Sequence, residues 1–384
     1  MRQITTYSML LLLCLLAGCR GDIPFLHSEE EQLQPVQHRH IRGFFLLNEG
    51  NMGSNKASLD FFDVGTGKYQ RNIYPTRNPG IVKELGDVGN DIAIYGSKLY
   101  AVINCSHYVE VMDVHTGRHV GSIDVLNCRY IVFHDGKAYI SSYAGPVQID
   151  PNARPGKVVE VDTTSLKITR EVVVGYQPEE MVITGGKLYV ANSGGYRYPN
   201  YDTTVSVVDL RTFAVDHTID VAINLHRMAL DRYGRIYVSS RGDYYDVKAD
   251  VYVVDTQTDR VTRRLDIPAS EMCLVGDSLY MTAVEWSYVT QSNTVSYTLY
   301  DVGRQEVVTR NFITDGTDRQ IKIPYGVAVD PETRDVYVCD AKDYVTPGTL
   351  YCFSPAGKLR WKVTTGDIPA HFAFTTVPLE DVGK

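Results

Sequence analysis

A short pattern of alternating apolar and polar positions recurs along the chain. Each copy begins with a polar turn residue, continues with an apolar residue and a tyrosine, and ends in alternating small and apolar residues. This period of two is typical of a half-buried β-strand. Six copies are clear and residues 43–47 form a degenerate seventh; the clear copies begin at Lys98, Lys137, Lys187, Arg235, Ser278 and Asp335.

Each copy sits within a larger unit of four predicted strands. A second strand follows each tyrosine motif and ends in a tight turn, as in 109–113; a third comes next, as in 119–125, and another precedes the motif, as in 92–95. Four strands per unit of about 40 to 57 residues is typical of a propeller blade. The sequence predicts an all-β, seven-bladed β-propeller of four-stranded blades. A two-sheet sandwich also contains many short strands, but seven near-equal units favour the propeller.

The two ends of the repeat region complement each other. The first unit lacks its inner strand, and residues 370–374 form an inner strand without the rest of a blade. We expect this C-terminal strand to join the N-terminal strands in one blade. Such closure removes the exposed edges that promote aggregation.

The connections between predicted strands fall into two unequal sets, which alternate between the faces of a propeller. One set consists of tight turns such as 95–97 and 134–136. The other is long and aromatic, and scaffolds commonly place binding sites on such loops. Aromatic and arginine side chains there are typical binding anchors, although they also pack on one another. The long set comprises 48–54, 142–156, 192–201, 241–245, 285–288 and 340–347.

A polar pair enters each predicted inner strand on that same face, and so should surround the mouth of the central channel. Examples are Arg129-Tyr130, Glu179-Glu180 and His226-Arg227. Buried charges need partners. The ring therefore forms either a self-satisfied ionic network or a hydrogen-bonding floor beneath the aromatic loops.

Position in these loops and in this ring selects the candidate ligand-binding residues. They are Asn48, Asn51, Asn104, Arg129, Tyr143, Tyr176, Tyr196, Arg197, Tyr198, His226, Arg227, Arg241, Tyr244, Tyr245, Glu285, Trp286, Tyr288, Tyr325, Tyr344 and His371.

The N-terminal segment predicts the compartment. An apolar run over 9–17 follows Arg2 and is the length of a signal-peptide core. Leu16-Ala17-Gly18-Cys19 resembles a lipobox, which predicts lipidation of Cys19; a plain signal peptide is the alternative. We therefore predict a signal peptide at 1–18, a solvated, lipidated tether at 19–40, the propeller at 41–375 and a C-terminal tail at 376–384.

Charge, cysteines and motifs narrow the function classes. The net charge of −8 is dispersed without a basic patch, which argues against nucleic acid. Buried free thiols are expected at the remaining cysteines, with a Cys105–Cys128 bridge left open. No catalytic motif occurs. His226 and His371 with Glu179 or Glu271 could hold a metal, but we expect neither a metal nor a cofactor.

Three loop segments carry a resemblance to a known family. With the lipobox and the tyrosine repeats, residues 48–53, 102–106 and 240–245 resemble the YncE/DUF5074-like propeller lipoproteins of Bacteroidetes, and most of all their BtuG-type surface proteins. The likeness covers about residues 41–375. It implies a surface propeller that binds cobalamin or related corrinoids and caps a TonB-dependent outer-membrane transporter. Asp22 and residues 29–31 are compatible with an acidic surface-export signal.

The resulting functional expectation is a non-enzymatic, lipid-anchored outer-membrane protein. It would bind a corrinoid on the loop-rich face and pass it to the transporter. The alternatives are a surface module that adheres to glycans or proteins and a metal-dependent propeller lyase or lactonase. An aromatic mouth without a carboxylate-histidine cluster favours binding over such chemistry.

Overall fold

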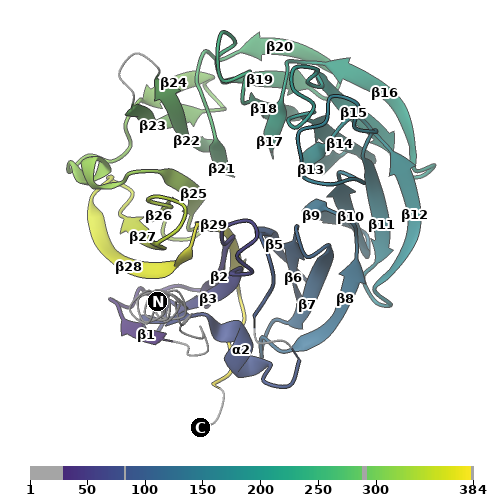
Figure 1. Cartoon of the computed structure of the whole chain (residues 1–384). Helices are drawn as coiled ribbons and strands as arrows, with labels where there is room; N and C mark the ends of the chain where they lie inside the picture. The colour runs from purple at the N-terminus through teal and green to yellow at the C-terminus, as the bar shows by residue number, and fades with distance from the viewer. Residues whose placement is uncertain (1–28, 82–83, 288–291, 382–384) are drawn as a thin grey trace, which may run out of the picture.

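The computed structural model describes residues 29–81, 84–287 and 292–381, which form seven antiparallel sheets around a central opening (Figure 1). This confirms the seven-bladed propeller. The predicted signal peptide and Cys19 lie outside the described residues. No helix in the described part is long and apolar enough to cross a membrane.

Six blades are each built from four consecutive strands, with the first strand innermost. They are β5 (Gly89–Tyr95), β6 (Lys98–Ile103), β7 (Tyr108–Asp113) and β8 (His119–Asp124); β9 (Cys128–His134), β10 (Lys137–Ser142), β11 (Lys157–Asp162) and β12 (Lys167–Val173); β13 (Pro178–Thr184), β14 (Lys187–Asn192), β15 (Thr204–Asp209) and β16 (Ala214–Asp220); β17 (Leu225–Leu230), β18 (Arg235–Ser240), β19 (Asp250–Asp255) and β20 (Arg260–Arg264); β21 (Glu271–Val275), β22 (Ser278–Ser287), β23 (Ser292–Asp301) and β24 (Glu306–Thr309); and β25 (Pro324–Val329), β26 (Val336–Asp340), β27 (Pro347–Phe353) and β28 (Leu359–Asp367).

The seventh blade closes the ring with strands from both ends of the chain. Its order from the channel outwards is β29 (Pro369–Thr375), β2 (Gly43–Asn48), β3 (Ser58–Asp63), β4 (Lys68–Arg71) and β1 (Glu29–Gln32). Phe44 pairs with Phe374 across the junction. The predicted closure by the C-terminal inner strand is therefore confirmed.

The N-terminal tether is more ordered than predicted. Strand β1 adds a fifth strand to the closing blade, with Glu29 opposite Arg71. Beyond it, the N–H groups of Leu33 and Val36 donate to backbone carbonyls of residues 67 and 64 at 2.8 Å. The expectation of a solvated tether is thus wrong for residues 29–40. Composition misses this strand because edge pairing uses main-chain groups and needs no apolar side chains.

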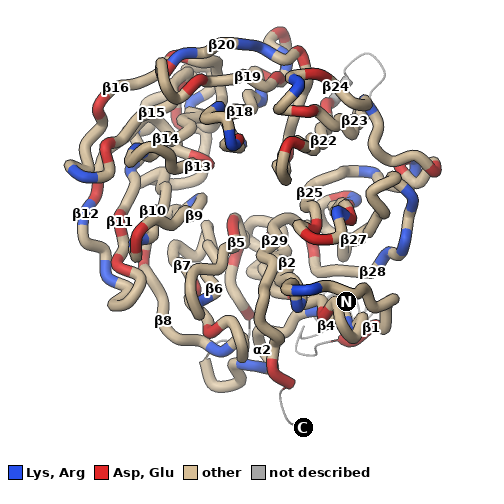
Figure 2. Tube along the Cα trace, turned by 180° about the vertical axis from the view of Figure 1, so that it is seen from behind, with Lys and Arg blue, Asp and Glu red and all other residues tan. Residues whose placement is uncertain are grey.

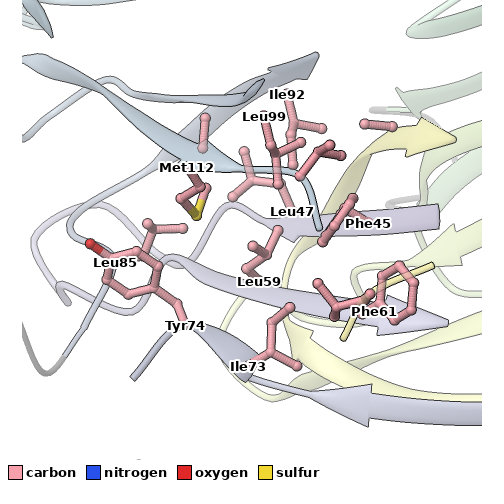
Figure 3. Packing of buried hydrophobic residues seen from close by; sticks show 14 of the residues in the cluster. Phe45, Leu47, Leu59, Phe61, Ile73, Tyr74, Leu85, Ile92, Leu99 and Met112 are labelled. Atoms are coloured by element: carbon pink, nitrogen blue, oxygen red, sulfur yellow. The ribbon is translucent and has the colours of Figure 1, made fainter. Parts of the chain in front are cut away.

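The core lies between adjacent blades. The repeat tyrosines are buried there; Tyr100 is fully inaccessible and Tyr189 is 1% exposed. Figure 3 shows one such cluster, in which Phe45 and Leu59 of the closing blade face Leu99 of the next blade. Burial of each such side chain contributes about 1.5 to 3 kcal/mol. The ring is therefore rigid enough to position loops on its faces.

Two short helices and the C-terminal tail lie outside the blades. Helix α2 (Ile73–Arg77) follows β4, and the 3-10 helix η1 (Thr317–Gln320) precedes β25. The tail packs on the first blade after the closure. Leu379 is buried there, and the N–H of Glu380 donates to the His115 carbonyl at 2.7 Å.

All five described cysteines are free thiols. Cys128, Cys339 and Cys352 are buried, whereas Cys105 and Cys273 are partly exposed. The Cys105–Cys128 bridge that the sequence left open is therefore not formed.

Candidate functional site

One end of the central channel opens into a cavity of about 970 Å³. Its walls come from the loops between the second and third strands of several blades: 49–57, 143–156, 193–203, 241–249 and 341–346. We call this end of the ring the mouth face and the opposite end the turn face. Both acidic and basic residues occur along the inner edge of the ring (Figure 2).

Local main-chain geometry fixes the loops of the mouth face. In the loop after β18, the Asp243 carboxylate accepts N–H bonds from Tyr245 and Val247 at 2.9 and 2.8 Å. Gly242 has a φ of +63°, and a Cβ there would lie 1.9 Å from the Val247 carbonyl oxygen. Only glycine permits this turn. The two tyrosines of the loop, Tyr244 and Tyr245, are thereby held at the rim.

Buried Glu179 is the centre of the first polar cluster on the cavity floor. Its carboxylate contacts Arg129 Nε and Nη2 at 3.1 and 3.0 Å. It also accepts a hydrogen bond of 2.5 Å from the Tyr143 hydroxyl. Arg241 Nη1 lies 3.5 Å from the same carboxylate. Burial lowers the pKa of Arg129, but Glu179 and the neighbouring tyrosines together raise it well above its usual value. The Arg129 guanidinium therefore stays charged and has its partner within the floor.

His226 stands beside this cluster and is neutral. Its Nε2 lies 2.9 Å from the Tyr130 hydroxyl. Burial lowers the pKa of His226 well below its usual value, and the positive charges of Arg241 and Arg227 lower it further. Arg227 pairs in turn with Glu271 at 2.7 Å. The floor therefore combines fixed ion pairs with an uncharged imidazole.

The far side of the floor is acidic. Glu49 accepts the Tyr325 hydroxyl at 2.8 Å, and its other oxygen lies 2.9 Å from His371 Nε2. Below it, a second cavity of about 360 Å³ is lined by His371, Asp91 and Glu180, among others. Burial raises the pKa of Glu180 to about 7, although Arg227 and the Met228 N–H oppose the shift.

The rim is aromatic and exposed. Tyr244 and Tyr245 are 61% and 65% exposed, and Tyr198 is 48% exposed. Met52 and Ile149 add exposed apolar side chains to the cavity lining. Large apolar side chains gathered around a cavity mark binding surfaces. The mouth is thus a polar, ordered floor beneath an apolar, accessible rim.

The structure brings most of the predicted site residues to this cavity. Those that line it are Asn51, Asn104, Arg129, Tyr143, Tyr196, Tyr198, His226, Arg227, Arg241, Tyr244, Tyr245, Tyr325 and Tyr344.

Several predicted residues lie elsewhere among the described residues. Asn48 is fully buried inside its blade, where its amide donates to Ser58 Oγ at 3.1 Å. The Arg197 guanidinium stacks on Tyr176, 3.5 Å from the ring centre, outside the cavity lining. His371 lines the second cavity. Glu285 is half-buried and does not line the mouth. The Trp286 side chain and Tyr288 lie outside the described residues.

The prediction also missed residues of the lining. Glu49 immediately follows the predicted Asn48, Tyr201 ends the predicted loop 192–201, and Glu271 belongs to the channel ring without having been selected. Ile149 and Met52 gave a usable signal, because large apolar residues are unusual in a polar loop. The role of Asp243 became clear only from the structure, in which its carboxylate accepts a hydrogen bond from the Tyr245 N–H of its own loop.

The alternative metal site does not assemble. His226 lines the mouth and His371 the second cavity, and each contacts a different partner. In the described part of the chain, no group of three or more His, Cys, Asp or Glu side chains is arranged to hold a metal ion.

Comparison with solved structures supports the fold. A hypothetical selenium-binding protein from Sulfolobus tokodaii matches with a TM-score of 0.64 at 10% identity, covering 88% of this chain and 95% of that one. A quinonprotein alcohol dehydrogenase-like protein from Bacteroides thetaiotaomicron gives 0.59 at 15% identity, covering 88% and 79%. Kuenenia stuttgartiensis hydrazine synthase gives 0.55 at 16% identity, covering 69% and 76%. At these identities the likeness concerns the fold alone.

Comparison by sequence defines the family. No curated protein matches the chain. A family model described as "Domain of unknown function (DUF5074)" matches residues 42–374, nearly the whole propeller. The chain therefore belongs to the DUF5074 family.

Proposed function

We propose that this protein binds a corrinoid, such as cobalamin, in the mouth-face cavity and passes it to a TonB-dependent outer-membrane transporter. A lipid on Cys19 would hold the protein at the outer membrane, with the propeller at the cell surface. The observation that carries the proposal is the cavity itself, with its aromatic rim and its ordered polar floor.

The chemistry of the cavity suits a corrinoid. Such a ligand is a broad ring with apolar edges and amide side chains around its circumference. Tyrosines at the rim offer apolar faces together with hydroxyl groups. Asn51 lines the wall and supplies an amide group for the ligand amides. A mainly apolar lining with a few placed polar groups is typical of small-molecule sites.

Order in the floor supports tight binding. Arg129, Tyr143 and Glu179 are already joined by short contacts without a ligand. A site that is ordered before binding loses less conformational entropy when the ligand arrives. This feature favours a dedicated binding protein over an adaptable surface.

The membrane and transporter parts rest on the sequence. The lipobox ends at Cys19, ten residues before Glu29 at the start of β1. Ten residues span at most about 36 Å when extended. A lipid on Cys19 would thus keep the propeller close to the membrane, within reach of an outer-membrane partner.

A protein-binding or glycan-binding adhesion module is the second candidate. It is favoured by apolar side chains of the mouth face that lie outside the cavity lining, Val247 at 46% and Val345 at 63% exposure. A ligand confined to the cavity leaves them uncovered. A macromolecular partner would bury them together with the rim.

Gel filtration with cyanocobalamin tests the proposal. We expect the purified domain, at micromolar concentration, to elute as a coloured complex. The variant Tyr233→Ala changes an exposed tyrosine of the turn face and should bind as the wild type does. Absence of a coloured complex at that concentration would overturn the corrinoid proposal and leave the adhesion module as the better candidate.

A further inference from the structure

Arg241 is the least tightly paired of the three arginines at the floor of the mouth. Arg129 and Arg241 both face Glu179. Arg129 makes two contacts with Oε2, whereas Arg241 Nη1 lies 3.5 Å from Oε1, which already accepts the Tyr143 hydroxyl. The Arg241 guanidinium makes no hydrogen bond to any described residue. The hydrogen-bonding capacity of the Arg241 guanidinium is therefore left largely unused.

The other carboxylates of the cavity do not compensate for Arg241. Glu271 pairs with Arg227, and Glu49 is bonded to Tyr325 and His371. Asp243 directs its carboxylate to N–H groups of its own loop. Each carboxylate that lines the cavity is therefore engaged elsewhere.

Arg241 is also placed to meet a ligand. Its side chain is 30% exposed and lines the cavity. Its backbone N–H donates to the Asn224 carbonyl at 3.0 Å, which fixes the start of the loop. A guanidinium on a fixed backbone, open to a cavity and without hydrogen bonds, is suited to a bidentate acceptor.

Neighbouring atoms independently indicate a ligand that accepts hydrogen bonds. Buried His226 Nδ1 and Arg227 Nε have no partner among the described residues. We assign the Tyr130 hydroxyl as donor to His226 Nε2, so the neutral imidazole carries its proton on Nδ1. Both unpaired atoms are then N–H donors, and both residues line the cavity. Buried unpaired donors are unfavourable unless an acceptor reaches them.

We propose that the mouth holds its ligand through an anionic group that pairs with Arg241. This inference rests on the proposed function: in a corrinoid the group is the phosphodiester of the nucleotide loop. This pairing should make the site selective among corrinoids. The site should prefer a complete corrinoid to a cobinamide, which has the same ring and amides but lacks the phosphodiester.

Titration of four proteins with two ligands tests the inference. Wild type, Arg241→Gln, Arg241→Lys and Arg154→Gln are each titrated with cyanocobalamin and with aquacyanocobinamide. Arg154 is an exposed arginine of the mouth face outside the cavity lining, so it is a matched control for the loss of charge. A charge-assisted hydrogen bond of the usual strength corresponds to about 10- to 100-fold in affinity.

We expect the wild type to bind cyanocobalamin about 10- to 100-fold more tightly than the cobinamide. Arg241→Gln should lose that preference by weakening cobalamin binding alone. Arg241→Lys should keep part of it, because the charge remains while the bidentate geometry is lost. Arg154→Gln should behave as wild type.

The outcomes separate this inference from the function beneath it. If wild type binds both ligands equally, or if Arg241→Gln weakens both equally, the anionic subsite is wrong and corrinoid binding stands. If wild type binds neither, both proposals fall. Thermal unfolding checks that the variants fold, which we expect because Glu179 retains Arg129 and Tyr143. Should the glutamine variant fail to fold, the lysine variant still tests the preference.

Discussion

The mouth face and the turn face are built from the same blades, yet they differ in both loops and chemistry. On the turn face, the first and second strands of a blade are joined by tight turns such as the one between β5 and β6. On the mouth face, loops of up to fourteen residues, as in 143–156, surround a cavity above buried ion pairs. The fold needs only the tight turns to close its strands. The elaborated face therefore indicates where function has been added to the scaffold.

Charges are treated differently on the outer strands and at the floor of the mouth. The pair Lys157–Glu171 lies on outer strands, and the glutamate is 62% exposed. Glu179 at the mouth is fully buried and contacts two arginines. Exposed pairs contribute little because water screens them, whereas a buried charge depends on its partners.

Removal of the Glu179 carboxylate should give the largest effect. Glu179→Ala leaves Arg129 without a partner in a buried site, so we expect a loss of about 3 to 5 kcal/mol in the free energy of unfolding. Urea denaturation measures this. The matched variant Glu171→Ala removes an exposed carboxylate and should cost less than about 1 kcal/mol. Equal losses in the two variants would remove the distinction between floor and surface.

The pH dependence of stability should identify the acidic groups below the floor. Burial raises the pKa of Glu180 to about 7 from its usual 4.5. Between these two values the folded protein holds a proton that the unfolded chain has lost, so stability should fall as pH rises through that window. The fall attributable to Glu180 is up to about 3 kcal/mol.

Glu180→Gln is the variant that isolates this effect. Because glutamine does not titrate, the variant should show a flatter stability profile between about pH 4.5 and 7. Denaturant titrations at several pH values measure both proteins. Profiles of identical slope would mean that Glu180 is ionised normally in the folded state.

Substitutions at the rim should have smaller effects than those at the floor, and they should change ligand affinity and not the free energy of unfolding. Tyr245→Ala removes an exposed aromatic side chain from the cavity lining. We expect cyanocobalamin binding to weaken by about 1 to 3 kcal/mol, measured by calorimetric titration, with little change in unfolding. Tyr233→Ala on the turn face is the control. Unchanged affinity in Tyr245→Ala would move the ligand contacts away from this loop.

The sequence was sufficient for the scaffold because the scaffold repeats. Period-two strands that begin with the same tyrosine motif predicted the blades, and the split unit predicted their closure through β29. Strand β1 escaped because its pairing depends on main-chain groups of β4, which composition does not reveal. Local sequence pattern therefore predicts the four strands of each blade and misses a further strand that pairs at the edge of a blade.

The sequence predicted where the site residues lie but not which side chains they contact. Topology alone placed Arg129, His226 and Arg227 at the channel mouth, since each lies at the start of an inner strand. The sharing of Glu179 between two arginines, and the stacking of Arg197 on Tyr176 outside the cavity, depend on side-chain directions that no periodicity encodes.

Hydrogen–deuterium exchange with and without cyanocobalamin compares ligand binding at the two faces in one measurement. If the mouth face binds the ligand, exchange should slow in the loops 143–156, 193–203 and 241–249 and stay unchanged in the turns of the turn face. Protection confined to the turn face, or no protection anywhere at saturating ligand, would contradict it.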